Sequence, residues 1–334
     1  MLMRAAIRER YGSVDVVEVR DIDRPTAGND EVLVRVVAAS VNRADLDGLG
    51  PRPGFARLII GVRAPRNHRL GLDVAGVVES VGPGVTRFRP GDRVFADLFL
   101  FGQGAFADYV CASERAFAPI PDLLTFEDAA TLPHSAILAV QGLRLRDGRT
   151  PGVGAKVLID GASGNVGPFA VQVAKSMGAE VTGVCSTAKI DLVRSLGADH
   201  VIDYTEIDYT ATGERYDWIV DTDSHHSILR VRRALRPNGV YVTLGGTALP
   251  IISALVVGPV ISLAGTRWTG LLLWWNPFDP DDLATIEALI VAGKVRPEID
   301  RHFPMDQIRD ALRYVDEGHA KGKLVIDVAG AGGG

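Results

Sequence analysis

The chain has 334 residues, of which 47% are apolar and 23% are charged, and its formal net charge is −5. This composition predicts a globular protein with a full core, and the length suits two domains of roughly 150 residues each. No block of like charge stands out along the chain. The electrostatic footprint of a nucleic-acid-binding protein is therefore missing, and we expect no nucleic-acid partner.

Two cysteines, Cys111 and Cys185, are too few for a disulfide framework or for a four-thiolate zinc site. We expect them to be free thiols in a reducing compartment. The start of the chain reaches the charged Arg4 too soon for a signal peptide, so we expect a cytoplasmic location.

Short valine-rich runs at residues 31–39, 74–81 and 92–95 predict strands in the first part of the chain. Turn residues separate these runs and no long helix intervenes, so we expect the strands to pair antiparallel. Thr125 has the spacing of a capping residue for the helix that opens the next part.

From residue 156 the chain alternates between strand and helix patterns, which predicts an α/β fold with a parallel, doubly wound sheet. A helix opened by Met305 and a last strand at 323–328 follow, and we expect that strand to return to the first domain. The predicted domains are 1–121, completed by 299–334, and 122–298. The predicted strands are 157–160, 181–185, 200–202 and 218–220, and the predicted helices are 166–177, 190–196 and 228–235.

The segment 237–266 carries no charged residue and is long enough to cross a membrane. Glycines and prolines break it repeatedly, and its start at 240–244 has the pattern of a strand. We therefore expect no membrane span, but a buried strand followed by a segment that lines a cleft or an interface.

A turn of small residues, Gly161-Ala162-Ser163-Gly164-Asn165-Val166-Gly167, joins a predicted strand to a predicted helix. Such a turn lets the backbone approach a pyrophosphate at the positive end of the helix dipole, which is the signature of dinucleotide binding. The alternative is a glycine-rich turn without a ligand. We expect contacts to the cofactor from Ser163, Gly164, Asn165, Val166 and Gly167.

The end of the next strand indicates which nicotinamide cofactor binds. An enzyme that uses NAD usually has an acidic residue there for the ribose 2′-hydroxyl. This chain has Cys185-Ser186-Thr187-Ala188-Lys189 instead. The hydroxyl of Ser186 and the cation of Lys189 suit the 2′-phosphate of NADPH, and Tyr204 could pack nearby. The alternative for Lys189 is a solvated lysine at a helix start.

Four stretches of the chain together resemble the medium-chain dehydrogenase/reductase superfamily and its quinone oxidoreductase group. One is Gly71-Leu72-Asp73-Val74-Ala75-Gly76, followed by Gly91-Asp92-Arg93-Val94. Another is Ala39-Ser40-Val41-Asn42-Arg43-Ala44-Asp45, which resembles the Ala-x-x-Val-Asn-x-x-Asp segment of quinone oxidoreductases. The others are Ala129-Ala130-Thr131-Leu132-Pro133 and the terminal Gly318-His319-Ala320-Lys321-Gly322-Lys323.

The resemblance implies a GroES-like β domain joined to a Rossmann domain that binds NADPH, and a homodimer. The zinc-dependent branches have a cysteine near position 42 and Gly-His-Glu where this chain has Gly71-Leu72-Asp73. A catalytic zinc needs three protein ligands, so we expect no metal. The implied reaction is hydride transfer from NADPH to a quinone or an α,β-unsaturated carbonyl, a small apolar substrate.

The resemblance also implies roles for single residues. Asn42 would lie near the nicotinamide and Lys323 would contact the cofactor, while Asp45 is more often structural. Gly245 and Gly246 end a strand where close approach of the backbone to the nicotinamide suits glycine. The alternative for Asn42 is a structural turn residue.

Four features depart from the family pattern or have no place in it. Leu138 stands where the family usually has threonine, and Thr222-Asp223-Ser224-His225-His226 stands where it usually has glycine. His134 could donate a proton, or it could be a solvated residue at a helix start. Phe55, Trp268, Trp274 and Trp275 could form the wall of an acceptor pocket or pack in an interface.

Two other functions remain open. The chain could bind NADPH as a sensor without turnover. It could also be an enoyl reductase that acts on a carrier-bound substrate, with Arg63, Arg66 and Arg69 as the candidates for a docking surface.

Overall fold

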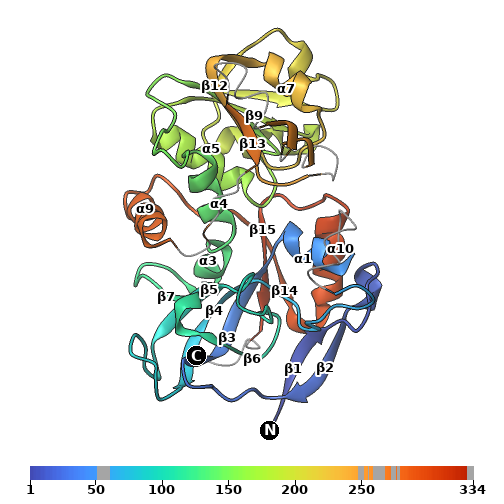
Figure 1. Cartoon of the computed structure of the whole chain (residues 1–334), viewed down its shortest axis with the longest axis vertical. Helices are drawn as coiled ribbons and strands as arrows, with labels where there is room; N and C mark the ends of the chain where they lie inside the picture. The colour runs from blue at the N-terminus through green and yellow to red at the C-terminus, as the bar shows by residue number, and fades with distance from the viewer. Residues whose placement is uncertain are drawn as a thin grey trace. The chain divides into compact units, whose positions relative to one another are not determined.

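The computed structural model describes residues 1–50, 61–246, 252–254, 256–258, 268–271, 276 and 279–328. Contacts between Cα atoms divide the chain into two compact units. The first consists of Met1–His134 and Ile299–Gly334, and the second is Ser135–Glu298. Figure 1 labels many of the helices and strands of both units.

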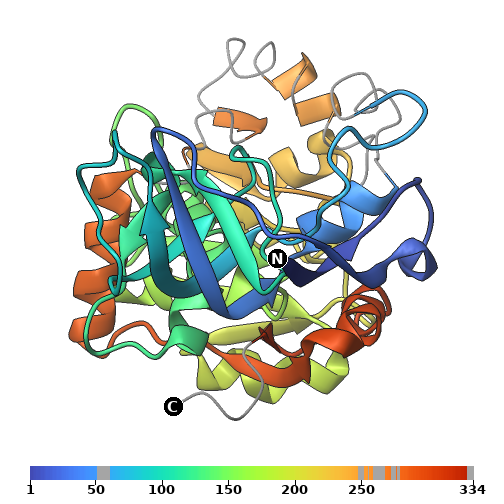
Figure 2. The same ribbon diagram turned by 90° about the horizontal axis from the view of Figure 1, so that it is seen from below.

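Among the described residues, a sheet of seven strands forms the first unit, in the order β14-β15-β3-β4-β5-β7, with β6 also paired to β3. The pairs β3–β4 and β4–β5 are antiparallel, as the sequence predicted, and Figure 2 shows these strands in blue to teal. β6, which the sequence did not predict, also pairs antiparallel with β3. β1 and β2 pair antiparallel in a separate ribbon. The strands are β1 Leu2–Ile7, β2 Glu18–Asp23, β3 Glu31–Val41, β4 Asp73–Val81, β5 Arg93–Asp97, β6 Tyr109–Ser113, β7 Phe117–Pro119, β14 Ile299–Pro304 and β15 Lys323–Asp327, and the helices are α1 Arg43–Leu49, α3 Phe126–Thr131 and α10 Ile308–Asp316.

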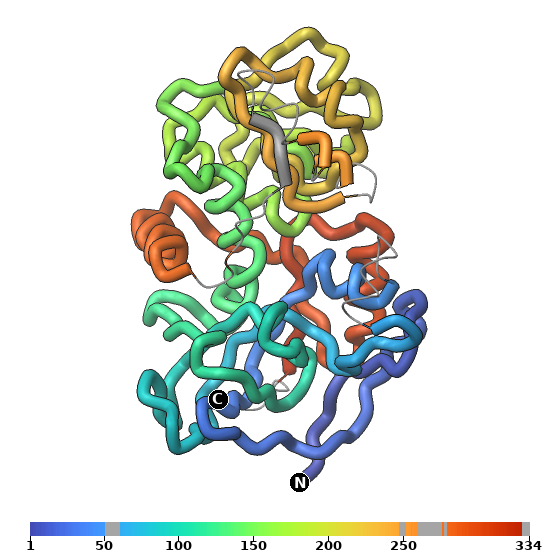
Figure 3. The backbone as a smooth tube through the Cα atoms, viewed as in Figure 1, coloured from blue at the N-terminus to red at the C-terminus, as the bar shows by residue number. Residues whose placement is uncertain are grey.

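The last strand of the chain returns to the first unit, as the sequence predicted. β15 pairs antiparallel with β3 and places Val325 opposite Ser40. In Figure 3 the red tube of this last strand lies beside the blue tube of β3. The sequence did not predict β14, because Ile299–Pro304 mixes charged and apolar residues and only Phe303 among them is buried.

The second unit contains a sheet of six described strands in the order β10-β9-β8-β11-β12-β13, and every pair in it is parallel. This is the strand order 3-2-1-4-5-6 of dinucleotide-binding folds, so the predicted doubly wound sheet is confirmed. The strands are β8 Lys156–Asp160, β9 Glu180–Cys185, β10 His200–Asp203, β11 Tyr216–Asp221, β12 Leu235–Thr243 and β13 Trp268–Leu271, and the helices are α4 Ser135–Gly142, α5 Gly167–Ser176, α6 Ile190–Ser195, α7 Ile228–Arg233 and α9 Pro280–Val291.

The end of one predicted helix and one predicted domain boundary differ from the structure for identifiable reasons. The helix predicted at 228–235 ends at Arg233, because Ala234 turns its carbonyl to the Tyr216 amide at 2.8 Å and Leu235 already begins β12. The domain boundary predicted after residue 121 lies after His134 in the structure. The reason is α3, which Thr125 caps as predicted and which packs on β3 and β4 of the first unit.

The uncharged segment begins as the sequence predicted. Its residues Val240, Tyr241, Val242 and Thr243 belong to β12 and are buried. Within the described ranges, no helix is long and apolar enough to cross a membrane.

Candidate active site

The register of the first sheet brings polar side chains of neighbouring strands together. Ser40 in β3 is opposite Asp73 in β4, and Asp73 is opposite Asp97 in β5. Lys323 begins β15, which borders β3 on its other side. All four of these side chains are buried, although the sheet around them is apolar. Burial of so many polar groups requires that each of them be hydrogen-bonded.

Asn42 lies between β3 and α1 and connects these groups. Its Nδ2 donates to Asp73 Oδ2 at 2.9 Å, and its Oδ1 accepts from Lys323 Nζ at 2.6 Å. Ser40 Oγ donates to the same carboxylate oxygen at 3.1 Å, and Lys323 Nζ lies 3.4 Å from it. The carboxamide of Asn42 is therefore held at both ends, and its orientation is determined by a cation and an anion.

Asp45 holds the backbone of Asn42. Its Oδ2 accepts the Asn42 amide at 2.8 Å, three residues back across the first turn of α1. The carboxyl is buried, and burial, with the nearby Asp73 charge, raises its pKa to about 7. This geometry agrees with the expectation that Asp45 is structural.

Burial dominates the electrostatics of the Asp73–Lys323 pair. Burial raises the pKa of Asp73. The charge of Lys323 opposes this rise, and the charge of Asp97 adds to it. Burial lowers the pKa of Lys323, which the Asp73 charge opposes. Each group thus needs the other to stay ionised, and the pair depends on its own geometry for stability.

His134 joins the same cluster. Its Nδ1 lies 2.8 Å from Asp97 Oδ2, and its backbone amide donates to Asp73 Oδ1 at 3.1 Å. The other Asp97 oxygen accepts the Phe99 amide at 2.8 Å, so the carboxylate is fixed. Burial lowers the pKa of His134, but the charge and hydrogen bond of Asp97 and the charge of Asp73 outweigh it, and the net pKa is raised.

The first unit therefore brings together three residues that the sequence singled out, Asn42, His134 and Lys323. Sequence reasoning missed Ser40 and Asp97 as members of the cluster, and named Asp73 only as part of a family motif. Their common signal was a polar residue at a strand end inside an apolar run, which becomes informative only once the strand register is known.

The second unit builds the predicted dinucleotide loop between β8 and α5. Gly161 has φ +77°, and a Cβ atom there would stand 2.2 Å from Thr222 Oγ1. At Gly167 a Cβ atom would stand 2.1 Å from the Gly161 carbonyl oxygen. Only glycine fits both positions, so the turn is as tight as pyrophosphate binding requires. The loop residues 163–166 lie between them, with Ser163 and Val166 buried and Gly164 and Asn165 half-buried.

The residues predicted to bind the 2′-phosphate lie at the adjacent strand end. Ser186 precedes a 3-10 turn, Thr187–Lys189, and the Tyr204 amide donates to the Cys185 carbonyl at 3.0 Å. The structure also places an acid there that the sequence analysis did not consider. Asp203 is opposite Cys185 in β10, and hydrogen bonds from Thr187 and Thr205 lower its pKa. Its oxygens are thus directed at hydroxyl groups of the chain.

The departure from the family at 222–226 has a structural explanation. The Ser224 amide donates to the Gly245 carbonyl at 3.1 Å, and its hydroxyl lies 2.5 Å from Thr243 Oγ1. Gly246 has φ +122°, and a Cβ atom there would stand 2.2 Å from the Ser224 nitrogen. The segment after β11 and the two glycines after β12 are therefore packed against each other. The positive φ and the close approach account for glycine at 246.

Leu138 occupies a distinct position in α4. It is half-buried, whereas every other residue of that helix, Ser135–Gly142, is buried. Leu138 is therefore the residue of α4 that is most accessible to solvent.

The aromatic cluster falls largely outside the described residues, which include neither Phe55 nor Trp274 and Trp275. Trp268 begins β13. Of the three arginines suggested as a docking surface, Arg63 and Arg66 are exposed and Arg69 is half-buried.

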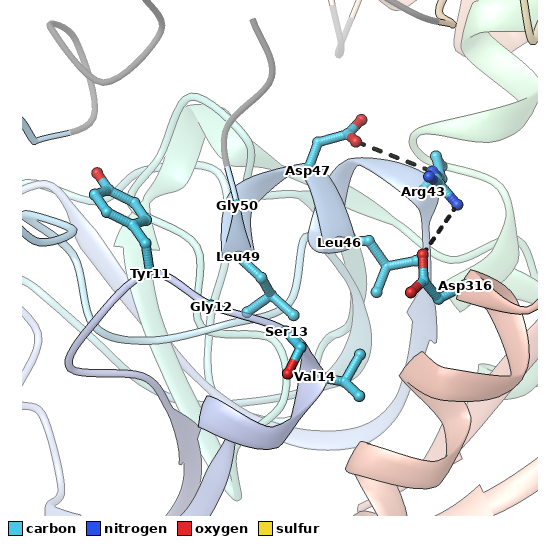
Figure 4. A pocket seen from close by; sticks show the side chains of 10 residues that line it. All are labelled: Tyr11, Gly12, Ser13, Val14, Arg43, Leu46, Asp47, Leu49, Gly50 and Asp316. Atoms are coloured by element: carbon cyan, nitrogen blue, oxygen red, sulfur yellow. Dashed lines mark hydrogen bonds and ion pairs between the residues drawn. The ribbon is translucent and has the colours of Figure 1, made fainter. Parts of the chain in front are cut away.

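A pocket of about 460 Å³ lies elsewhere in the first unit, beside α1 (Figure 4). Arg43 is its cation and lies 3.9 Å from Asp47 and 3.5 Å from Asp316, so its charge is compensated. None of the predicted site residues lines it. The lining residues are Tyr11, Gly12, Ser13, Val14, Arg43, Leu46, Asp47, Leu49, Gly50 and Asp316.

The chain matches two family models, the alcohol dehydrogenase GroES-like domain over residues 28–122 and the zinc-binding dehydrogenase over residues 196–326. The mitochondrial NAD(P)H oxidoreductase RTN4IP1 of Mus musculus is 33% identical over 98% of this chain and 89% of its own length. The chain belongs to the medium-chain dehydrogenase/reductase family. It is an oxidoreductase of the quinone oxidoreductase-like group.

Two further proteins are similar to this chain over nearly its whole length. The chloroplastic NADPH-dependent alkenal/one oxidoreductase of Arabidopsis thaliana is 32% identical over 97% of the chain and 79% of its own length. The solved quinone oxidoreductase of Coxiella burnetii is 29% identical, with a TM-score of 0.85 over 98% of this chain and 100% of its own.

The zinc of the second family model does not fit the residues present. Within the described ranges, no group of three His, Cys, Asp or Glu side chains could hold a metal ion. Cys111 Sγ lies 3.4 Å from Glu31 Oε2, Cys185 is buried at the end of β9, and His134 is bound to Asp97. A catalytic zinc would need three ligands around an open position, and these side chains do not supply them.

Proposed function

We propose that this enzyme uses NADPH to reduce a quinone or an α,β-unsaturated carbonyl, without zinc. The observation that carries the proposal is the loop from Gly161 to Gly167, whose backbone tolerates no side chain at either end and which opens α5 in a parallel sheet. A dinucleotide is the ligand class that such a loop binds. The names of the relatives support a nicotinamide as that dinucleotide.

The cofactor, when bound, supplies the hydride. Residues 163–167 would hold its pyrophosphate with backbone amides, while Ser186, Lys189 and Tyr204 would hold the 2′-phosphate. Gly245, Gly246 and Leu138 would border the nicotinamide half. The Asp203 carboxylate already accepts a hydrogen bond from Thr205 at 2.7 Å. We therefore propose that Lys189 and Ser186 bind a 2′-phosphate, and not that Asp203 binds the ribose hydroxyls of NADH.

Asn42 and Lys323 would act on the nicotinamide and the acceptor. The Asn42 carboxamide is fixed before any ligand arrives, so its orientation costs no reorganisation during the reaction. Lys323 is buried, where a positive charge acts more strongly than in water on negative charge that develops on the acceptor oxygen.

His134 would complete the reaction by donating a proton. With its Nδ1 bound to Asp97, the proton for transfer is the one on Nε2. Hydride addition to the β-carbon of an enone leaves an enolate, which takes this proton at the α-carbon. The imidazole then regains a proton from solvent, so charge and atoms balance.

The experiment is NADPH oxidation with purified protein and a panel of quinones and enones, with NADH and EDTA as controls. We expect turnover with NADPH that EDTA leaves unchanged and that is much weaker with NADH. Tight NADPH binding without turnover of any free acceptor would contradict the proposal. Turnover restricted to carrier-bound enoyl thioesters would assign the site to a carrier-linked enoyl reductase instead.

A further inference from the structure

Arg8 is a buried arginine that the reaction described above does not use. It follows β1, where its amide donates to the His68 carbonyl at 2.8 Å and its own carbonyl lies 2.9 Å from His68 Nδ1. The residue is only 3% exposed. Its Nε and Nη1 are closed off from solvent and have no hydrogen-bond partner in the part of the chain that the structure describes.

A buried guanidinium without a partner is unusual, because arginine cannot lose its charge to relieve the cost of burial. Two other arginines of this unit, Arg4 and Arg43, have carboxylate partners. Arg4, in β1, lies 2.8 Å from Asp108, and Arg43 in the pocket of Figure 4 lies between Asp47 and Asp316.

The ionisable groups near Arg8 do not take the place of a hydrogen-bonded anion. Burial lowers the pKa of Arg8, and only Tyr11 and Asp45 oppose that effect. Asp45 already accepts the Asn42 amide, and its own pKa of about 7 leaves it only partly ionised at neutral pH. The positive charge of Arg8 is therefore not neutralised within the described residues.

The packing around Arg8 leaves its outer nitrogen accessible. Nη2 is not among the enclosed atoms, and it lies beside Gly48 of α1, where a Cβ atom would stand 3.6 Å from it. The guanidinium thus borders α1, the helix that Asn42 caps. Asp45 of that helix accepts a hydrogen bond from the Asn42 amide, and its charge acts electrostatically on Arg8.

We infer that Arg8 binds an anionic group, and that this group is a carboxylate carried by the acceptor. Nη2, the nitrogen that is not enclosed, would donate to a carboxylate oxygen, and the negative charge would compensate the buried guanidinium. The identity of the anion as part of the acceptor rests on the proposed function. Binding of a carboxylate at Arg8 does not rest on it.

The first test is binding, with formate, acetate and trans-cinnamate as probes and cinnamyl alcohol as the uncharged control, at constant ionic strength. We expect the carboxylates to raise the melting temperature of the wild type and not that of Arg8→Met. Arg4→Met, which removes a compensated arginine from the preceding strand β1, should keep the response. No carboxylate effect on the wild type, or an equal effect on Arg8→Met, would overturn the inference.

The second test is the stability of the variant without added anions. If Arg8 is kept for a ligand, Arg8→Met removes a buried uncompensated charge and should leave the melting temperature unchanged or raise it. A clear fall in melting temperature, which Arg8→Lys restores, would assign Arg8 to structure and refute a ligand site.

The third test is specificity, measured as kcat/KM for an enone carboxylic acid and for its methyl ester. We expect the wild type to prefer the acid by about tenfold or more, and Arg8→Met to lose that preference while it retains turnover of the ester. Equal preference in both proteins would place the anion elsewhere than on the acceptor. If neither compound is reduced but the carboxylates still stabilise the wild type, the proposed function fails and the Arg8 site stands.

Discussion

At the scale of single residues, the first unit concentrates ionisable groups where water is excluded. Asp73, Asp97 and Lys323 are almost completely buried, and each is held by neighbours within hydrogen-bonding distance. Such a cluster stabilises the fold only while its partners are complete, because an unpaired buried charge costs more than the pair contributes.

Lys323→Met should therefore destabilise the protein by about 3–5 kcal/mol, since it leaves Asp73 buried without its cation. In Asp73→Asn/Lys323→Met both charges are absent, and we expect the double variant to regain much of that loss. Urea unfolding of the wild type, both single variants and the double variant measures the coupling. Losses that simply add would show that the two charges act independently.

The His134–Asp97 pair predicts a pH dependence. Because the pKa of His134 is raised in the folded protein, the stability that the pair contributes is fully present below the unfolded pKa of about 6.5. It is lost as the pH rises through the higher folded value. Enone reduction should decline over the same range, as the imidazolium loses its proton.

Asp97→Asn removes the negative charge that keeps His134 protonated, so it should move this decline to lower pH. The profile of kcat/KM against pH tests the shift. Quinone reduction is the internal control, because oxygen takes its proton from water without help and His134→Gln should affect it less than enone reduction. A profile unchanged in Asp97→Asn would remove His134 from the reaction.

At the scale of elements, the ends of strands carry the function. The β8–α5 loop is tight because two glycines meet the backbone that surrounds them. Gly167→Ala would place a methyl group 2.1 Å from the Gly161 oxygen, so the loop must open. We expect NADPH affinity to fall by about tenfold or more, measured by quenching of intrinsic fluorescence. Gly152→Ala is the matched control, since a Cβ atom there meets nothing within 4 Å.

The end of β9 determines the choice between NADPH and NADH in our proposal. A hydrogen bond to a charged group contributes about 1.5–3 kcal/mol, so Lys189→Ala should reduce the preference for NADPH by roughly ten- to a hundredfold. The ratio of kcat/KM for the two cofactors measures it. A ratio that does not change would indicate that Lys189 is a solvated lysine that does not select the cofactor. Asp203 would then be the next residue to substitute.

At the scale of the whole molecule, we propose a homodimer, as the family resemblance implied. β13 lies at one end of the six-stranded order and, among the described strands, pairs only with β12. An unpaired strand edge offers backbone groups to another chain. Sedimentation at micromolar concentration should give twice the mass of 35.7 kDa. A monomer under these conditions would contradict the proposal, and would leave the edge of β13 to be covered in another way.

Some elements of the fold could be predicted from the sequence and others could not. Local patterns were sufficient for the parallel sheet and its dinucleotide loop, because alternation of strand and helix and the spacing of glycines are properties of short segments. They failed at Arg233, where the helix ended early, since a carbonyl–amide contact between Ala234 and the distant Tyr216 decided the boundary.

Local patterns in the amino-acid sequence were enough to predict the family architecture, the loop at Gly161 and Gly167, and Asn42, His134 and Lys323 as candidate residues. That Ser40, Asp73 and Asp97 meet them became known from the folded chain, because the register of strands far apart in the chain has no signal in any one segment. The same holds for Arg8. A missing partner is a property of everything packed around a side chain, and it becomes visible only when the chain has folded.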